Sequence, residues 1–326
     1  MNVGILGAGG IAKKMTRTLN MMEGAMANAA AYAVGSRSYD KAAAFAKEQG
    51  VEKAYGSYAE MLKDPAVDLV YVAVPHSHHY EYMKLCLEYG KNILCEKPFT
   101  VNADQAKEIL AEGEKQGLLV AEAIWPRYLP IRKVMDNVIA GGAIGKANSL
   151  SANLCWAGAG SKERLRSPAL AGGALLDAGV YVINFALMTF GNDIKDITST
   201  WVKYETGVDA ANSITFTYND GRMAILQSSM VSHAPQRAVI FGEKGYIEFE
   251  EIINCRGIKV FTGDAQPVIH EPPKQLTGYE YQVEACCRAI AAGETECPEM
   301  PHREIIRVME IMDQIRKSWG LKYPME

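Results

Sequence analysis

A lysine directly after a short apolar run is the first residue whose position suggests chemistry. In the stretch LCEKPFT, Glu96, Lys97 and Pro98 follow the run 92–95. Two opposite charges and a proline at the end of a strand are typical of a solvated turn. In open parallel sheets, however, ligands bind beyond the carboxyl ends of the strands. We therefore expect Lys97 to face a bound cofactor, with a solvated turn lysine as the alternative, and we expect a cis Lys97–Pro98 bond.

A glycine-rich turn follows the first apolar run. The residues 7–12, GAGGIA, fit the pattern G-x-G-x-x-A and open a helical pattern. Gly7 permits the tight turn, Gly9 lets a pyrophosphate approach the backbone, and Ala12 allows close packing of helix on sheet. The first N–H groups of the helix, near Gly10 and Ile11, would bind the phosphates. The motif predicts a dinucleotide site, and a merely structural glycine turn is the alternative.

The residues after the second expected strand bear on the choice of cofactor. An acid at this point pairs with the ribose 2′-hydroxyl of NAD, but this chain reads Gly35-Ser36-Arg37-Ser38. A carboxylate would repel a 2′-phosphate, whereas a serine hydroxyl and a guanidinium would hold it. These residues favour NADP over NAD. The alternative is that Ser36 caps the next helix and Arg37 is solvated.

Three histidines, His76, His78 and His79, follow Pro75 after another apolar run. Three histidines within four residues do not easily converge on one ion without distant carboxylates or thiolates. The sequence shows no such partner motif at a suitable spacing. We therefore expect no metal site.

These residues need a sheet to position them, and the first third of the chain predicts one. Short apolar runs alternate with segments that have apolar residues at helical spacing. The expected strands are 3–6, 30–35, 69–74, 92–95 and 118–121, and the expected helices are 39–49, 78–89 and 102–116. Asn102 is a suitable N-cap for the last of these helices. The alternation predicts an α/β fold, with a doubly wound parallel sheet of the Rossmann type over residues 1–122.

The pattern changes after about residue 122. Apolar residues alternate with threonines at 214–218, and Asn219-Asp220-Gly221 then supplies a hairpin turn. Further strands are expected at 222–231, 236–242, 245–250 and 257–262, and helices at 129–140, 171–190, 279–292 and 303–318. The pattern predicts a C-terminal α+β domain over 123–326, built on a large, mostly antiparallel open sheet.

Composition limits the partners of this 326-residue chain. Its formal charge of −4, with acids and bases interspersed, does not suggest nucleic acid or an anionic membrane. The N-terminus lacks the features of a signal peptide, and we expect no membrane-spanning stretch. The seven cysteines include no C-x-x-C pair. We expect them to be reduced thiols in a cytoplasmic protein.

Several motifs together resemble one enzyme family. GAGGIA, V-P-x-x-x-H at 74–79, C-E-K-P at 95–98 and G-G-A-L-L-D-A-G-V-Y at 172–181 are similar to the glucose–fructose oxidoreductase / inositol dehydrogenase family. E-A-I-W-P-R-Y-L-P at 122–130 and E-T-G-V-D at 205–209 resemble the branch of dimeric dihydrodiol dehydrogenases and NADP-dependent D-xylose dehydrogenases. The resemblance implies a Rossmann domain, a second domain with an open sheet, and a homodimer.

The resemblance also implies roles for individual residues. Lys97 and Tyr181 would be catalytic, and Asp177 would flank the same pocket. The residues that would touch the cofactor or shape its site are Gly7, Gly9, Gly10, Ile11, Ser36, Arg37, Pro75, His76, His79, Glu96, Lys97, Trp125 and Arg127. Many relatives have asparagine in place of His76 and histidine in place of Tyr181, although tyrosine is typical of the dihydrodiol branch.

The expected chemistry suits these residue types. Oxidation of a secondary alcohol requires departure of a hydride and removal of the hydroxyl proton. A free tyrosine, with a pKa of about 10, is a poor base near neutrality. A nearby ammonium such as that of Lys97 would favour the phenolate and stabilise alkoxide charge. The alternative for Tyr181 is an amphipathic core residue with a bonded hydroxyl.

We therefore expect an oxidoreductase that transfers a hydride between NADP(H) and a hydroxyl or carbonyl of a sugar, polyol or vicinal diol. One alternative is a reductase of an imine or a tetrapyrrole, substrates that the resembled family also includes. Another is a non-catalytic NADP-binding regulator with the same fold. A lysine–tyrosine pair beside nicotinamide argues against the regulator, because a binding module has no use for it.

Overall fold

The computed structural model describes residues 1–25, 29–158, 162–263 and 265–326, which form two compact units. The first unit comprises Met1–Trp125 and Gln275–Met309, and the second comprises Pro126–Lys274 and Glu310–Glu326. The chain thus returns to the first unit after completing most of the second. The sequence-based division at 122/123 did not assign the returning segment 275–309 to the first domain.

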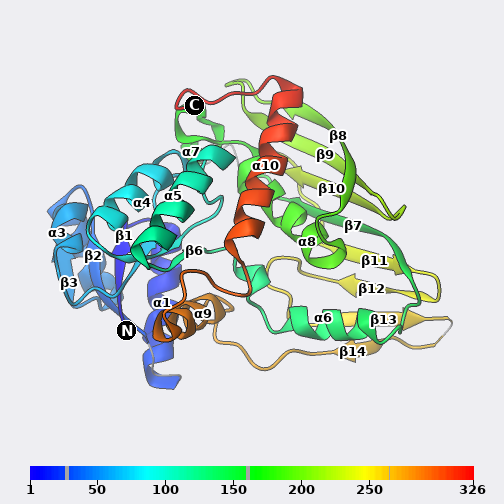
Figure 1. Ribbon diagram of the computed structural model, residues 1–326, viewed down its shortest axis with the longest axis horizontal. Helices are drawn as coiled ribbons and strands as arrows, with labels where there is room; N and C mark the ends of the chain where they lie inside the picture. Colours follow the sequence, from blue (N-terminus) through cyan, green and yellow to red (C-terminus); the bar gives the residue numbers. More distant parts are fainter. Residues whose placement is uncertain (26–28, 159–161, 264) are drawn as a thin grey trace. The chain divides into compact units, whose positions relative to one another are not determined.

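The first unit contains a six-stranded sheet in the order β3-β2-β1-β4-β5-β6, with every neighbouring pair parallel. Figure 1 labels its strands β1, β2, β3 and β6. Its strands are β1 (Asn2–Leu6), β2 (Ala30–Gly35), β3 (Lys53–Tyr55), β4 (Leu69–Val72), β5 (Asn92–Cys95) and β6 (Val120–Glu122). All four residues of β4 are buried, as expected for a strand covered on both faces. The strand order reverses between β1 and β4, which is where open α/β sheets bind ligands. The predicted doubly wound sheet is confirmed.

Helices cover the first unit's sheet. They are α1 (Gly10–Ala25), α2 (Tyr39–Gln49), α3 (Tyr58–Leu62), α4 (His79–Glu88), α5 (Ala103–Gln116) and α9 (Glu280–Ala292). Asn102 is the N-cap of α5, because its side-chain oxygen accepts a hydrogen bond from the Gln105 N–H at 2.9 Å. This predicted cap is confirmed. The strand β3 and the helix α3 were not predicted, since segments of three and five residues are too short to show a period.

The second unit contains an eight-stranded sheet in the order β14-β13-β12-β11-β7-β10-β9-β8. Its strands are β7 (Ala147–Cys155), β8 (Ile194–Lys203), β9 (Asp209–Tyr218), β10 (Met223–Ser229), β11 (Ala238–Gly242), β12 (Gly245–Phe249), β13 (Ile258–Thr262) and β14 (Val268–His270). Among the strand pairs of the described residues in this sheet, β7–β10 is parallel and the others are antiparallel. The predicted hairpin joins β9 to β10, and Gly221 takes the left-handed conformation at its turn, with φ of 86°. The mostly antiparallel sheet is confirmed.

One face of this sheet packs on helix α8 (Val180–Phe190), which lies against β7 and β10 (Figure 1). Ala224 and Leu226 of β10 point to this covered face and are fully buried, whereas Met223 and Ile225 point to the opposite face and are exposed. The other helices that lie at least partly in this unit are α6 (Ile131–Ala140), α7 (Glu163–Arg166) and the second half of α10 (His302–Trp319).

The segment before α8 is irregular. A short 3-10 turn at Pro168–Leu170 is followed by a π-helical turn, Leu175–Gly179, which runs directly into α8. By length and composition alone, Pro168–Phe190 is sufficient to cross a bilayer, contrary to our sequence-based expectation. However, 89% of its most apolar window is buried inside the protein. It is therefore the core helix of the second unit.

Candidate active site

The glycine turn between β1 and α1 leaves space where a dinucleotide would approach. Gly7 has a φ of 108°, and a side chain there would place its Cβ 2.7 Å from the carbonyl oxygen of Ala73. At Gly9 and Gly10, by contrast, a Cβ would meet no atom of the described residues within 4 Å. Gly7 is therefore required by the turn itself. The open backbone at Gly9 and Gly10, at the start of α1, fits the phosphates of NAD(P).

The structure separates the roles of the two serines after β2. Ser38 is the N-cap of α2, and its Oγ accepts from the Lys41 N–H at 3.5 Å. Ser36 is buried, with its own N–H donated to the Tyr55 carbonyl at 3.2 Å. The alternative that Ser36 caps the helix is therefore wrong. Arg37 lies between these serines and is exposed.

An aromatic pair that was not predicted from the sequence lies near Arg37. Tyr58 of α3 and Tyr82 of α4 meet edge to face, with ring centroids 4.7 Å apart. Burial raises the pKa of both hydroxyls, and the charge of Arg37 opposes the rise. No local motif marks this pair, because α3 and α4 meet only in the folded unit.

Hydrogen bonds to Glu96 stabilise the turn that carries Lys97. The Lys97–Pro98 bond is cis, as predicted. Glu96 is buried and accepts hydrogen bonds from the Tyr71 hydroxyl and, at 3.3 Å, from the Lys97 N–H. Lys97 itself is half-buried, directly beyond the carboxyl end of β5. The glycine turn lies beyond the carboxyl end of β1, so both features belong to the same edge of the parallel sheet.

His79 connects two loops of this edge. Its Nδ1 lies 2.8 Å from the Pro98 carbonyl oxygen and its Nε2 lies 3.0 Å from the Val74 carbonyl oxygen. Burial lowers the pKa of His79 to about 4, so the ring is neutral and donates to one of the two carbonyls. The imidazole is fully buried. His79 therefore shapes the site by fixing the Lys97 turn to the end of β4.

The neighbouring histidines have other surroundings. His76 follows Pro75 in a 3-10 turn, is buried, and packs 5.9 Å from the His79 ring. His78 stacks on Tyr82, and its Nδ1 is 2.8 Å from the Ser77 Oγ. Within the described parts of the chain, no group of three His, Cys, Asp or Glu side chains could hold a metal ion.

Trp125 ends the first stretch of the first unit and stacks on a residue of the returning stretch. Its ring lies 4.2 Å from that of Tyr279, with an angle of 11° between the planes. The loop before α9 is fixed by Glu280, whose carboxylate accepts from the Leu276 and Gly278 N–H groups at 2.6 and 2.7 Å. The 154-residue separation of Tyr279 and Trp125 gives no local signal of this stacking contact.

The second unit holds the other predicted catalytic residues. Asp177 lies in the π-helical turn, is buried, and pairs with Arg164, whose Nη1 is 3.1 Å from Oδ1. Tyr181 is half-buried in the first turn of α8. The two side chains are thus carried by one continuous helical segment. Arg164 was missed, because its stretch K-E-R-L-R is typical of a solvated surface.

Arg127 supports α8 next to Tyr181. Its Nε donates to the Asn184 Oδ1 at 2.5 Å, and the Asn184 Nδ2 donates to the Val180 carbonyl at 2.8 Å. Both Arg127 and Asn184 are buried. In the second unit the structure thus brings Arg127 together with the helix that carries Asp177 and Tyr181. The remaining predicted site residues belong to the first unit.

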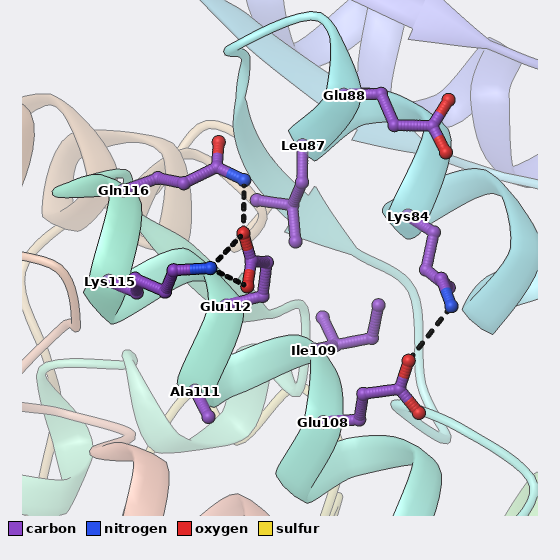
Figure 2. A pocket seen from close by; sticks show the side chains of 9 residues that line it. All are labelled: Lys84, Leu87, Glu88, Glu108, Ile109, Ala111, Glu112, Lys115 and Gln116. Atoms are coloured by element: carbon purple, nitrogen blue, oxygen red, sulfur yellow. Dashed lines mark hydrogen bonds and ion pairs between the residues drawn. The ribbon is translucent and has the colours of Figure 1, made fainter.

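A separate surface cleft of about 500 Å³ lies between α4 and α5 (Figure 2). None of the predicted site residues lines it. Figure 2 shows ion pairs among its charged side chains, with Lys84 bound to Glu108 at 2.8 Å and Lys115 bound to Glu112 at 3.1 Å. We assign no function to this cleft.

Comparison with known proteins agrees with this geometry. Residues 1–123 match the family model described as "Oxidoreductase family, NAD-binding Rossmann fold", and residues 133–248 match the GFO/IDH/MocA C-terminal domain. Trans-1,2-dihydrobenzene-1,2-diol dehydrogenase from Xenopus tropicalis is 33% identical over 299 residues, which cover 90% of each chain. The human enzyme of that name is 31% identical over 306 residues, again covering 90% of each. This chain belongs to the GFO/IDH/MocA family.

Solved structures share the fold of this GFO/IDH/MocA protein. A 3-ketoreductase from Actinomadura kijaniata, in complex with NADP and TDP-benzene, superposes with a TM-score of 0.87 at 24% identity, covering 97% of both chains. An aldose–aldose oxidoreductase from Caulobacter crescentus also gives 0.87, at 20% identity over 98% of both chains. The family match and the relatives named above, and not these structures, show that the chain is an oxidoreductase with an NAD(P)-binding Rossmann domain.

Proposed function

We propose that this protein is an NADP-dependent dehydrogenase that acts on a CH–OH group of a vicinal diol, sugar or related polyol. The observation that carries the proposal is the placement of Lys97. Lys97 follows the carboxyl end of β5, at the same edge of the sheet as the open glycine turn. A cationic side chain at that edge can stabilise an oxyanion beside a dinucleotide.

The preference for NADP rests on Ser36 and Arg37. The position that would carry an acid for NAD holds a buried serine, and the next residue is an exposed arginine. Neither residue caps α2, which leaves both side chains available for a 2′-phosphate. The Actinomadura kijaniata 3-ketoreductase was crystallised with NADP, which supports the same cofactor class.

In the proposed mechanism, the bound nicotinamide would accept or supply the hydride at the substrate carbon. The Tyr181 hydroxyl exchanges a proton with the substrate oxygen, which is the acid–base part of the reaction. The Lys97 ammonium stabilises negative charge on that oxygen and on the tyrosine. Asp177 forms an ion pair with Arg164, so the carboxylate in the helical segment before Tyr181 has a cationic partner.

The proposed substrate class rests on the substrates for which the relatives are named, and not on the lining of a pocket. The curated relatives are named for trans-1,2-dihydrobenzene-1,2-diol, a vicinal diol, and the Caulobacter crescentus enzyme for aldoses. Variants of the Actinomadura ketoreductase that replace a lysine or a tyrosine have been solved, which are the two residue types assigned here. A reductase of an imine or a tetrapyrrole, and a regulator without turnover, are the competing functions.

A substrate screen tests the proposal. The purified protein is mixed with NADP⁺ and trans-1,2-dihydrobenzene-1,2-diol, aldoses or inositols, and NADPH formation is followed at its absorbance maximum. Dicarbonyls with NADPH test the reverse direction. We expect turnover with at least one diol or sugar, and faster turnover with NADP⁺ than with NAD⁺. NADPH binding without turnover of any of these compounds would favour the regulator.

We also propose that the protein is a cytoplasmic homodimer formed through the uncovered face of the second unit's sheet. Strand register places Met223, Ser149, Phe241, Tyr246 and Phe261 in one row on that face. Met223, Phe241 and Tyr246 are 39–43% exposed. Apolar side chains from four of these five strands thus lie in one row on an exposed sheet face, and large exposed apolar patches mark interaction sites.

A further inference from the structure

A buried carboxylate lies at the start of the helical segment that carries Asp177 and Tyr181. Asp209 is the first residue of β9 and is fully buried. Its Oδ2 accepts a hydrogen bond from the Leu175 N–H at 2.7 Å and another from the Asn212 Nδ2 at 2.8 Å. Leu175 begins the π-helical turn, so its N–H is one of those that a helix start leaves without an intrahelical partner.

The surrounding sequence is built to bring Asp209 to this point. Gly207 takes a φ of 103° in the turn between β8 and β9, and Thr206 donates its hydroxyl hydrogen bond to the Arg166 carbonyl next to α7. Val208 is fully buried. The stretch E-T-G-V-D at 205–209 thus has a structural purpose, which is to seat the carboxylate against the helix start.

The glycine pair of G-G-A-L-L-D-A-G-V-Y is explained by the same contact. A Cβ on Gly173 would lie 2.2 Å from the Asp209 Oδ1, and a Cβ on Gly172 would lie 2.5 Å from the Leu165 carbonyl oxygen. Neither position can therefore carry a side chain while the carboxylate and α7 stay in place. Two separate sequence motifs thus meet at one carboxylate.

Asn212 orients the Asp209 carboxylate through a hydrogen bond. The Asn212 Oδ1 accepts from the Ser228 hydroxyl at 2.9 Å, which directs the Asn212 amide N–H group toward Asp209. Desolvation raises the pKa of Asp209 to about 6, opposed by hydrogen bonds from Asn212 and Leu175 and by the charge of Arg316. Burying a charged carboxylate costs free energy. The interaction of this carboxylate with the N–H groups of a helix start offsets part of that cost.

We propose that Asp209 is a positioning residue for the reaction: through Leu175 it fixes the π-helical turn and the first turn of α8, and thereby the reactive orientations of Asp177 and Tyr181. Tyr181 is six residues from Leu175, about 9 Å along a helix, so Asp209 acts through the backbone. The proposal rests on the proposed role of Tyr181. A misplacement of about 1 Å in a catalytic group can cost on the order of a hundredfold in rate.

Two substitutions distinguish the hydrogen bond from a general loss of stability. Asp209→Ala removes the acceptor, whereas Asp209→Asn can keep both hydrogen bonds, because its amide oxygen can replace Oδ2. The amide nitrogen would take the place of Oδ1, which has no hydrogen-bond partner among the described residues. The matched control is Ile247→Val, a conservative change at a fully buried residue of β12 in the same unit.

The readouts are turnover of trans-1,2-dihydrobenzene-1,2-diol with NADP⁺, the Kd for NADPH, and hydrogen exchange of the segment 175–181. For Asp209→Ala we expect kcat to fall about tenfold to a hundredfold and exchange of the segment to rise at least about tenfold. NADPH affinity should change less than about twofold, because the glycine turn lies in the other unit. Asp209→Asn should restore kcat and exchange to within about threefold of wild type, and Ile247→Val should alter neither.

Asn212→Ala is a milder second variant if Asp209→Ala does not fold. It removes one donor to the same oxygen and should raise exchange in the same segment and lower kcat severalfold. Unchanged kcat in the folded alanine variants, or an equal loss in Asp209→Asn, would overturn the proposal. Failure of the proposed function has a different signature, since a Tyr181→Phe enzyme with full turnover would leave the exchange result intact.

Discussion

The cofactor preference can be tested at Arg37. A hydrogen bond to a charged group contributes about 1.5–3 kcal/mol. Arg37 is exposed, and solvent screening keeps its contribution from reaching the top of that range. Each 1.4 kcal/mol corresponds to a factor of about ten in Kd. We therefore expect Arg37→Ala to weaken NADP⁺ binding about tenfold to a hundredfold and to leave NAD⁺ binding nearly unchanged.

The assay is titration of both cofactors into wild type and variant, followed by intrinsic fluorescence or calorimetry. Lys47→Ala is the matched control, because Lys47 is an exposed cation in the last turn of α2, the helix that follows Arg37. It should leave both affinities within about twofold. The NADP⁺ loss in Arg37→Ala should also shrink as ionic strength rises. Equal losses for NAD⁺ and NADP⁺, or an equal effect of Lys47→Ala, would refute the assignment of Arg37 to the 2′-phosphate.

The remaining predictions concern assembly and acid stability. Ile225→Asp on the uncovered sheet face should convert a dimer to a monomer in light scattering at micromolar concentration, whereas Met21→Asp, at an exposed apolar residue of α1, should not; a wild-type monomer would refute the interface. Hydrogen bonds from Tyr55 and from Lys53 lower the pKa of Asp64. A carboxylate whose pKa is lower in the folded than in the unfolded protein stabilises the fold at pH values above its unfolded pKa, and this stabilisation is lost as the pH falls. Asp64→Asn should therefore lower the free energy of unfolding by about 1–2 kcal/mol at pH 7. The difference should shrink below about pH 4, and a constant gap between urea midpoints would contradict this.

Local patterns predicted the parts of the fold that local forces determine. The helix α2 was predicted over its full observed range, and the cap at Asn102 was predicted from one side chain and the pattern that follows it. The β9–β10 hairpin followed from its turn residues around Gly221. In each case, interactions among residues within about ten positions of one another determine the local structure.

Contacts between distant segments could not be predicted in the same way. The partner of Asp177 is Arg164, and Tyr279 meets Trp125 only because 275–309 returns to the first unit. The motif glycine Gly173 gave no indication of the carboxylate that excludes its side chain. These pairings depend on how whole elements pack, which periodicity along the chain does not specify.

The most direct test of the central claim is single-turnover hydride transfer in Tyr181→Phe, with NADPH binding measured on the same sample. Removal of general acid–base help should lower the rate about a hundredfold to ten-thousandfold, with the Kd for NADPH nearly unchanged. Lys97→Met should also lower it, and the double variant should be far less than additive because the two groups act together. A Tyr181→Phe protein that keeps most of its rate while folded and bound to NADPH would contradict the account.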